Sequence, residues 1–302
     1  MAQELIYTSA ERGLRPGTRG FCTVAYTQGM LPQTIQLLEA LSAYKNLYAA
    51  HESMAESSPV ALSHCRGNFL GRTASILSRV GPTHADHTNR SNKLAHHLLI
   101  QQRERPLGGP AWLASQPDIF CEDWAESPHV ITEPRTLPAG DEENCRAETW
   151  ERLTGDAGHA GLLASSFHAN PEAITVLVFT PGMDMLGLIR EALRLLPVSE
   201  RWNVTFSTYF TSLPAGATCA WRCCVADSEE LREARRHPRT AVIDLTAPLT
   251  PVLREDRFVR LAREGGSPEV EPAENENDKP LHFKLLSEKR DVNQITLRSR
   301  RY

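Results

Sequence analysis

Residues 174–182 read ITVLVFTPG, and this stretch identifies the clearest structural unit of the chain. Its first six residues are apolar or β-branched, which is typical of a buried strand. The TPG that follows favours a turn. From Met185 to Leu196 the apolar side chains recur on one side of a helix, which Pro197 ends. The stretch therefore predicts a β-α unit.

This β-α unit lies inside a predicted second module, residues 147–263. Alternating apolar and polar residues predict further strands at 202–210, 218–225 and 240–245. A charged stretch at 229–236 predicts a short helix between the last two strands. The second module is therefore expected to mix strands and helices.

A first module, residues 1–125, precedes it. Strands are predicted at 4–9 and 21–27, and a Pro-Gly turn signal between them favours a long-looped hairpin. Helical spacing that starts at Pro32 and extends to Tyr48 predicts a helix. The other elements expected here are strands at 59–65, 73–80 and 92–100 and a short helix after Pro110.

Two segments have compositions typical of irregular backbone. Residues 126–146 are rich in Pro, Glu and Thr, which predicts a linker or long surface loop. Residues 264–302 offer too little apolar surface to offset chain entropy, which predicts a disordered tail. The fold class predicted for the whole chain is α+β: a mostly antiparallel N-terminal module, a second α/β module with a β-α unit, and the tail.

Composition narrows the classes of partner. The chain has 302 residues, a net charge of −4 and 7 cysteines. The negative charge argues against general attraction to nucleic acid or an anionic membrane, and no apolar run approaches the roughly 18 residues that span a bilayer. An odd cysteine count in a large chain favours a reducing compartment, and the N-terminus lacks signal-peptide features. We expect a cytoplasmic protein with no nucleic-acid or membrane partner.

The sequence contains neither a GxxxxGK[ST] phosphate loop nor a GxGxxG motif after a strand. A nucleotide would therefore be bound by a partner, and we expect no cofactor. A weak alternative is a zinc site formed by His64, His84 and His87. The last two histidines lie in a Gly-Pro-Thr loop, where exposed histidines are common, so we expect no metal.

A catalytic alternative is a Cys/His hydrolase centred on Cys22, with His64 or His96 as the base. Either histidine could reach the thiol across a sheet. However, the sequence has no flanking signature of a cysteine hydrolase and no GxSxG elbow. Strand alternation groups Cys22 with Val24, so we expect Cys22 to be a buried structural residue.

The most unusual stretch, TNRSNKLAHH, begins at Thr88 and crowds polar and basic side chains before an apolar strand. Its two cations could bind a phosphate or an acidic partner surface. The structural alternative is a polar loop that caps the strand by bonding to its own backbone. The residues assigned to partner or phosphate binding are Asn89, Arg90, Asn92, Lys93 and His96.

Several short motifs along the chain belong together. They are Ile6–Ala10, Gly13-Leu14, Gly17, Gly20–Ala25, Gly29-Met30, Leu38–Tyr44, His64, Gly71–Thr73, Leu77–Arg79, Asn89–His97 and Gly109–Ala111. As a set they resemble the N-terminal domain, second type, of the bacterial GTPase-associated proteins. Trp202–Tyr209 extends the resemblance into the second module.

The resemblance implies an accessory component that acts beside a GTPase in bacterial NTP-dependent conflict or signalling systems. It implies a GTPase partner encoded nearby and supplies no catalytic residue. We therefore expect a non-catalytic adaptor or regulator. The Cys/His hydrolase is the alternative, a structural assembly subunit is the weaker alternative, and the oligomeric state stays open.

Overall fold

The protein is described by a computed structural model. The residues that it describes are 1–48, 58–69, 72–141, 144–214 and 216–268. The strands are β1 (Gln3–Ala10), β2 (Gly20–Thr27), β3 (Ala61–Phe69), β4 (Arg72–Thr83), β5 (Asn92–Ile100), β6 (His129–Ile131), β7 (Ile174–Phe179), β8 (Phe206–Ser207), β9 (Trp221–Val225) and β10 (Thr240–Asp244). The helices are α1 (Pro32–Leu41), α2 (Gly109–Ala114), α3 (Glu148–Thr154), α4 (Gly158–Ala169), α5 (Met185–Arg194), α6 (Val198–Arg201), α7 (Glu229–Arg236) and α8 (Arg257–Glu264).

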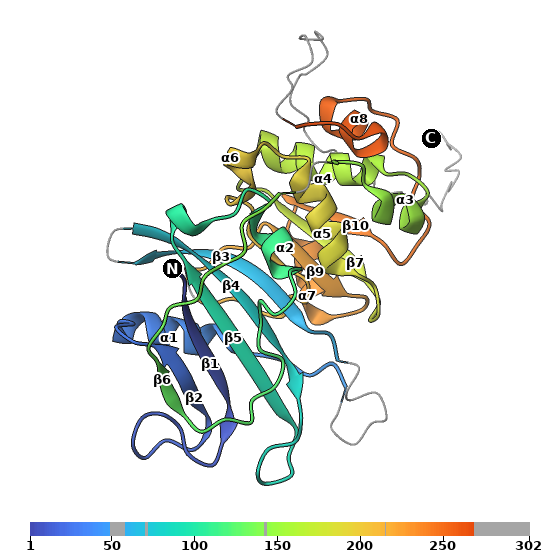
Figure 1. The fold of residues 1–302 in the computed structure, drawn as a ribbon. Helices are drawn as coiled ribbons and strands as arrows, with labels where there is room; N and C mark the ends of the chain where they lie inside the picture. The colour runs from blue at the N-terminus through green and yellow to red at the C-terminus, as the bar shows by residue number, and fades with distance from the viewer. Residues whose placement is uncertain (49–57, 70–71, 142–143, 215, 269–302) are drawn as a thin grey trace, which may run out of the picture.

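One mixed 10-stranded sheet runs through both predicted modules, in the order β10-β7-β9-β8-β3-β4-β5-β1-β2-β6. Figure 1 shows β1 to β5 in the lower half of the molecule and helices α3, α4, α5 and α8 gathered at the upper end. A mixed sheet together with eight α-helices among the described residues confirms the predicted α+β class. None of the helices in the described ranges has both the length and the apolar character that a membrane crossing requires.

The first half of the sheet is mainly antiparallel, as predicted. Strand β1 pairs antiparallel with β2 and β5, and β4 pairs antiparallel with β3 and β5. The expected hairpin is present, with Leu5 opposite Tyr26. Helix α1 covers one face because Ile35 and Leu38 pack against Leu5 and Leu99. The apolar alternation of the strands therefore produces a one-sided core under α1.

The predicted β-α unit is confirmed in the second half. Strand β7 lies between β10 and β9 and pairs parallel with both. Val176, Leu177 and Val178 are 0% exposed because helices cover both faces. Leu177 packs in the cluster that contains α5, and its two neighbours pack with Leu231 of α7. This double cover explains why the strand sequence is continuously apolar.

The two halves join where β3 pairs antiparallel with β8. Ser63 lies opposite Ser207 and His64 lies opposite Phe206. Just beyond β8, the backbone N–H of Thr208 donates to Leu62 O at 2.9 Å. Because the pairing is continuous across this point, the halves share one sheet.

Arg201 reinforces the join from the side. Its side chain is 1% exposed, so each guanidinium donor needs a partner inside the protein. It donates to the carbonyl oxygens of Leu196 at 3.1 Å, Leu107 at 2.9 Å and Arg194 at 3.1 Å, and it also bonds the Asp141 carboxylate. One buried cation thus ties the chain after β5 to α5 and α6.

Several strand bounds shift by a few residues, and three predicted elements differ more strongly from the structure. The helix from Pro32 ends at Leu41 rather than extending to Tyr48, and Ser42 N bonds Glu39 O to close its last turn. Within the predicted strand 202–210, only Phe206–Ser207 is a strand, because Thr205 O accepts hydrogen bonds from both Ala220 N and Trp221 N instead of following a regular ladder. The predicted linker 126–146 contains β6, which pairs parallel with β2.

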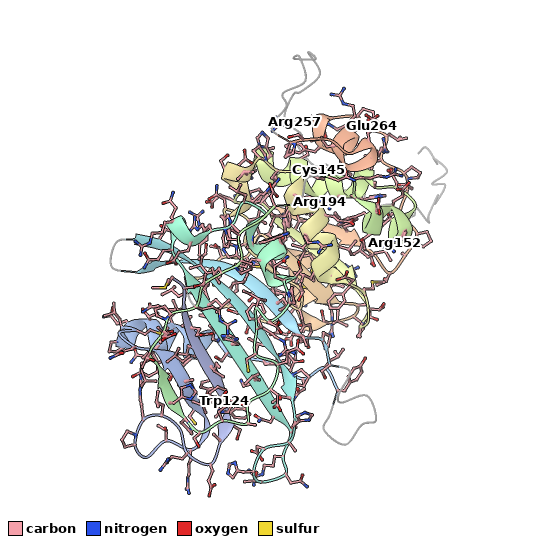
Figure 2. The ribbon with its side chains drawn as sticks, in the orientation of Figure 1. Trp124, Cys145, Arg152, Arg194, Arg257 and Glu264 are labelled. Atoms are coloured by element: carbon pink, nitrogen blue, oxygen red, sulfur yellow. The ribbon has the colours of Figure 1, made fainter. Side chains whose placement is uncertain are left out.

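Helices α3, α4, α6 and α8 were not predicted from the sequence. Helix α8, whose ends Arg257 and Glu264 are labelled in Figure 2, overlaps the predicted tail only at Glu264. Most of that tail, residues 269–302, lies outside the described residues. Helices α4 and α8 pack closely at Gly161, where an added Cβ would lie 2.5 Å from both Val259 N and Val259 Cα. Only glycine permits this backbone approach.

We expect Gly161→Ala to lower the free energy of unfolding by about 1–3 kcal/mol, because backbone atoms cannot yield to the new methyl group. A decrease would be informative, because replacing glycine with alanine inside a helix otherwise raises the free energy of unfolding by about 1 kcal/mol. Urea unfolding provides the measurement. The control is Ser165→Ala in the same helix, which should change stability by no more than about 0.5 kcal/mol. Unchanged or increased stability in Gly161→Ala would contradict the close packing of α4 on α8.

Candidate functional site

The polar loop between β4 and β5 is folded around Asp86. Its Oδ1 accepts hydrogen bonds from Thr88 N at 2.8 Å, Thr88 Oγ1 at 2.6 Å and Arg90 N at 3.1 Å. Asn89 adopts a left-handed conformation with φ of 60°, which asparagine tolerates better than most residues. The Thr88 hydroxyl and the other bonds hold the pKa of Asp86 well below its ordinary value. The loop is therefore a closed turn with an ionised carboxylate at its centre.

Two side chains fasten this loop to β1. Ser9 Oγ donates to Asp86 Oδ2 at 2.8 Å. Asn92 Oδ1 accepts from Ser9 N at 3.1 Å and from Lys93 N at 2.8 Å. Asn92 is thus occupied in holding the loop to the sheet, and not in the partner binding that the sequence predicts for it.

The two cations of this stretch, Arg90 on the loop and Lys93 at the start of β5, have different surroundings. Arg90 is exposed beside the turn. Lys93 is half-buried, and its Nζ donates to Ser42 O at 2.7 Å. The same Nζ lies 5.1 Å from the ring centroid of Phe21 and 5.9 Å from that of Tyr7. Burial lowers the pKa of Lys93. Sequence reasoning missed this contact because Lys93, Tyr7 and Phe21 come from three different strands.

His96 requires a correction. It is 0% exposed, so it cannot contact a partner at the surface. Its Nε2 lies 2.9 Å from Glu4 Oε2, and its Nδ1 accepts from Cys121 N at 2.8 Å. Arg135 Nε donates to the same Glu4 oxygen at 3.0 Å. Because Nδ1 accepts this bond it carries no proton, so the ring is neutral, and burial lowers the pKa of His96 in the same sense. The ring thereby links the chain after α2 to β1.

His64 and His97 are structural in the same way. His64 Nδ1 lies 2.6 Å from Val204 O, which can only accept, so Nε2 accepts from Ser75 Oγ at 3.0 Å. His97 is bonded to Ser42 Oγ at 2.8 Å and Ser78 Oγ at 2.7 Å. Burial lowers the pKa of each ring to about 3. Both are neutral at pH 7, and both ring nitrogens are already used.

The structure does not bring Cys22 together with either proposed base. The Cys22 thiol donates to Gly20 O at 3.1 Å, and among the described residues no hydrogen bond joins it to His64 or His96. Burial raises the pKa of the Cys22 thiol, and the Glu39 carboxylate adds to the shift. A nucleophilic cysteine needs the opposite shift.

The weak zinc alternative has no matching geometry either. His64 is buried at the β3–β8 junction, whereas His84 and His87 are exposed on the β4–β5 loop. His84 Nε2 lies 3.9 Å from Asp123 Oδ2. Within the described ranges, no three His, Cys, Asp or Glu residues are grouped to hold a metal ion.

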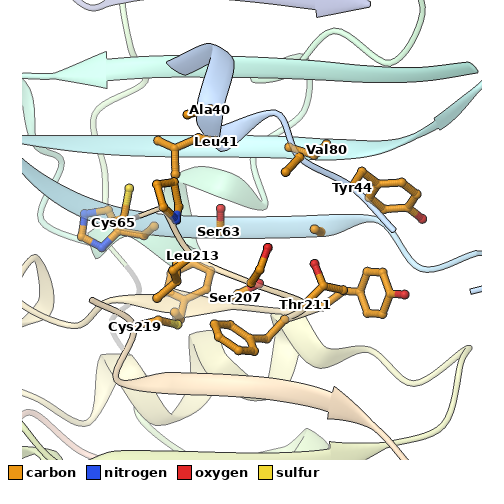
Figure 3. A pocket seen from close by; sticks show the side chains of 18 of the residues that line it. Ala40, Leu41, Tyr44, Ser63, Cys65, Val80, Ser207, Thr211, Leu213 and Cys219 are labelled. Carbon is orange, nitrogen blue, oxygen red and sulfur yellow. The ribbon is translucent and has the colours of Figure 1, made fainter. Parts of the chain in front are cut away.

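A mainly apolar cavity of about 280 Å³ lies at the junction of the halves. Figure 3 shows Leu41 and Val80 on one side of it and Leu213 and Cys219 on the other. Tyr44 and Tyr209 pack against each other here, with their ring centroids 5.9 Å apart. Their hydroxyls donate to Pro59 O at 2.8 Å and Lys45 O at 2.9 Å. These contacts make the cavity part of the packing at the junction.

The neutral histidines predict acid sensitivity. Between pH 6.5 and about 3 the unfolded chain protonates His64 and His97 while the folded protein does not, so stability falls as the pH falls. We expect His97→Asn to reduce the pH dependence of the free energy of unfolding by about 1.4 kcal/mol per pH unit near pH 5. Urea unfolding at a series of pH values measures it.

The control for this experiment is His87→Asn, because His87 is exposed. The pH dependence of its free energy of unfolding should match that of the unchanged protein. An equal slope in His97→Asn and in the unchanged protein would contradict the buried neutral state of His97.

Comparison with known families gives two matches, which adjoin along the chain. Residues 1–140 match the family model described as GTPase-associated protein 1, N-terminal domain type 2. Residues 147–247 match the one described as GTPase-associated protein 1, middle domain. No curated protein and no solved structure matches the chain. With both domains matched in order, the chain belongs to the GTPase-associated protein 1 family.

Proposed function

We propose that this protein is a non-catalytic adaptor or regulator that acts beside a partner GTPase in a bacterial NTP-dependent system in the cytoplasm. The observation that carries the proposal is the family match, because both matched domains are described as GTPase-associated. The partner is expected to be a GTPase encoded nearby. The proposal assigns recognition to this chain and nucleotide hydrolysis to the partner.

The docking element in this proposal is the β4–β5 loop, with Arg90 as its principal contact. Arg90 is exposed, and the three hydrogen bonds to Asp86 Oδ1 hold the backbone beside it in one conformation. A preorganised loop loses less conformational entropy on binding. A guanidinium pairs well with carboxylate or phosphate oxygens, so the expected counterpart is an acidic patch or a phosphate on the GTPase.

Asn89 and Lys93 have secondary parts in this docking surface. Asn89 shapes the turn through its left-handed backbone and is exposed. The Nζ of Lys93 is already bonded to Ser42 O, so in this proposal Lys93 adds positive electrostatic potential near the loop without a direct contact. Asn92 supports the loop, and His96 is removed from the contact set because it is buried.

The hydrolase alternative has less support. It needs a histidine with an available nitrogen near Cys22, whereas His64 and His96 each use both nitrogens in structural bonds. The raised pKa of the Cys22 thiol also disfavours the thiolate that such chemistry requires.

Charge reversal at the loop tests the proposal. We expect Arg90→Glu to weaken binding to the GTPase by about tenfold or more, because a carboxylate would repel the acidic counterpart. High salt should weaken binding of the unchanged protein in the same direction. Titration calorimetry with the purified GTPase measures both effects. Arg90 suits this test better than Lys93, whose loss would leave Ser42 O without its hydrogen bond.

The matched control is Arg236→Glu, an exposed arginine on α7 in the second half of the chain. It changes the net charge equally and should leave affinity unchanged. Equal affinities for the two variants and the unchanged protein would refute docking through the loop. Turnover of GTP by the isolated protein, or a stable homo-oligomer that ignores the GTPase, would overturn the adaptor function itself.

A further inference from the structure

A second cavity, of about 360 Å³, opens beside the β1–β2 hairpin. It lies between Glu39 of α1, Tyr7 of β1 and the loop that joins the two strands. This volume is near the lower end of the range of about 300–1,000 Å³ for small-molecule sites. The size suits a small ligand rather than a folded partner.

An aromatic surface forms one wall. The rings of Tyr7 and Phe21 are nearly parallel, with an interplanar angle of 10° and centroids 6.4 Å apart. Phe21 remains 49% exposed although it contacts both Tyr7 and Lys93. A half-exposed phenylalanine beside a cavity provides a stacking surface for a planar ring.

Cations also line the cavity. Arg15 and Arg19 line the cavity and are exposed on the β1–β2 loop. Together with Lys93, which lies 5.1 Å from the Phe21 ring, they concentrate positive charge in a chain whose net charge is −4. Two guanidinium groups at one cavity are the arrangement that binds phosphate oxygens.

The loop that carries these arginines is internally bonded. Gly13 N donates to Thr18 O at 2.9 Å, and Leu14 N donates to Thr23 O at 3.0 Å. Thr18 Oγ1 donates to Arg15 O at 2.6 Å. Gly17 supplies the left-handed turn, with φ of 81°. The arginine backbones are therefore held in place before a ligand arrives, which lowers the entropy lost on binding.

Glu39 adds the remaining chemistry. Its Oε1 accepts from Thr23 Oγ1 at 2.6 Å, which orients the carboxylate at the cavity. A carboxylate has further lone pairs that accept hydrogen bonds from ribose hydroxyls or a base amine. Its negative charge repels a phosphate, so the phosphate is expected at the arginines and not at Glu39. The cavity thus presents a ring surface, an anion-binding wall and a hydrogen-bond acceptor.

We propose that this cavity binds a mononucleotide, with its phosphate on Arg15 and Arg19, its base stacked on Phe21 and its sugar or base edge bonded to Glu39. A phosphotyrosine side chain would satisfy the ring and the phosphate, but it has neither a ribose hydroxyl nor a base edge to donate to Glu39. The inference goes beyond the proposed function, because it concerns the isolated chain and requires no GTPase.

Calorimetry of the isolated protein tests the assignment with four classes of probe: the ribonucleoside monophosphates, ribose 5-phosphate, the nucleosides and phosphotyrosine. At least one monophosphate should bind about tenfold or more tightly than ribose 5-phosphate, as expected for one base stacked on an aromatic ring. It should also bind more tightly than its nucleoside and than phosphotyrosine. The Arg15→Gln/Arg19→Gln variant should lose most of the binding.

Phe21→Leu separates the two contacts. It keeps an apolar side chain but removes the ring, so monophosphate affinity should fall to that of ribose 5-phosphate while ribose 5-phosphate affinity stays unchanged. The control is Arg12→Gln, an exposed arginine of the same loop outside the cavity lining. Arg90→Glu should also leave nucleotide binding intact, which separates this site from GTPase docking.

Three results would overturn the assignment. They are no monophosphate binding by the unchanged protein, equal affinity for ribose 5-phosphate and the monophosphates, and tighter binding of phosphotyrosine than of every monophosphate. Binding that survives in the Arg15→Gln/Arg19→Gln variant would place the ligand elsewhere and would likewise overturn it.

Discussion

The pairing of β3 with β8 is the constraint on which the rest of the architecture depends. The ladder is short, with Ser63 opposite Ser207 and His64 opposite Phe206, yet it makes one sheet of two halves with different topologies. An antiparallel half and a parallel half would otherwise each present an unpaired edge. Side chains compensate for the short ladder. His64 bonds Val204 O, Trp202 Nε1 donates to Pro106 O, and Arg201 bonds carbonyls on both sides.

Buried polar side chains repeatedly serve as fasteners in this protein. Glu4 joins His96 and Arg135 beneath the surface. Burial alone would raise its pKa, but the hydrogen bonds from both residues and the charge of Arg135 outweigh burial and lower it. The half-buried Asp156 makes a similar link, since it bonds Arg263 at 2.7 Å and 2.9 Å and thereby holds α8 in place. A buried group is stable only when its donors and acceptors are satisfied, and here the satisfying partners come from distant segments. Residues that resemble catalytic candidates in the sequence therefore act as structural links.

The exposed chemistry gathers at the opposite end of the sheet from α8. Figure 1 shows the β1–β2 loop and the β4–β5 loop side by side at the lower end of the molecule. Ser9 links them directly, since it precedes the first loop and its hydroxyl donates to Asp86 in the second. A ligand in the cavity beside Phe21 would therefore lie one strand away from the proposed docking loop. The two proposed sites therefore share one end of the sheet and are joined through β1.

Much of the fold could be predicted from the sequence, because local periodicity reflects which faces a segment buries. The β1–β2 hairpin, β5 and the β7-α5 unit were all predicted, and the bounds of β5 and β7 match the structure residue for residue. The family resemblance also came from sequence alone. The local sequence pattern did not predict elements that depend on packing partners far away in the sequence. Strand β6 needs β2 beside it to form, and α4 has apolar residues on all sides because both α5 and α8 cover it.

For the candidate site, too, one part could be predicted from the sequence and another part could not. The sequence by itself identified the basic, polar stretch around Arg90 as unusual, because its composition stands out before an apolar strand. Only the tertiary structure decided the part of each residue. It buried His96 on Glu4, used Asn92 to anchor the loop, and set Lys93 against Phe21. Sequence pattern records which face of its own strand a side chain occupies, whereas burial and bonding depend on what the remainder of the chain places against that face.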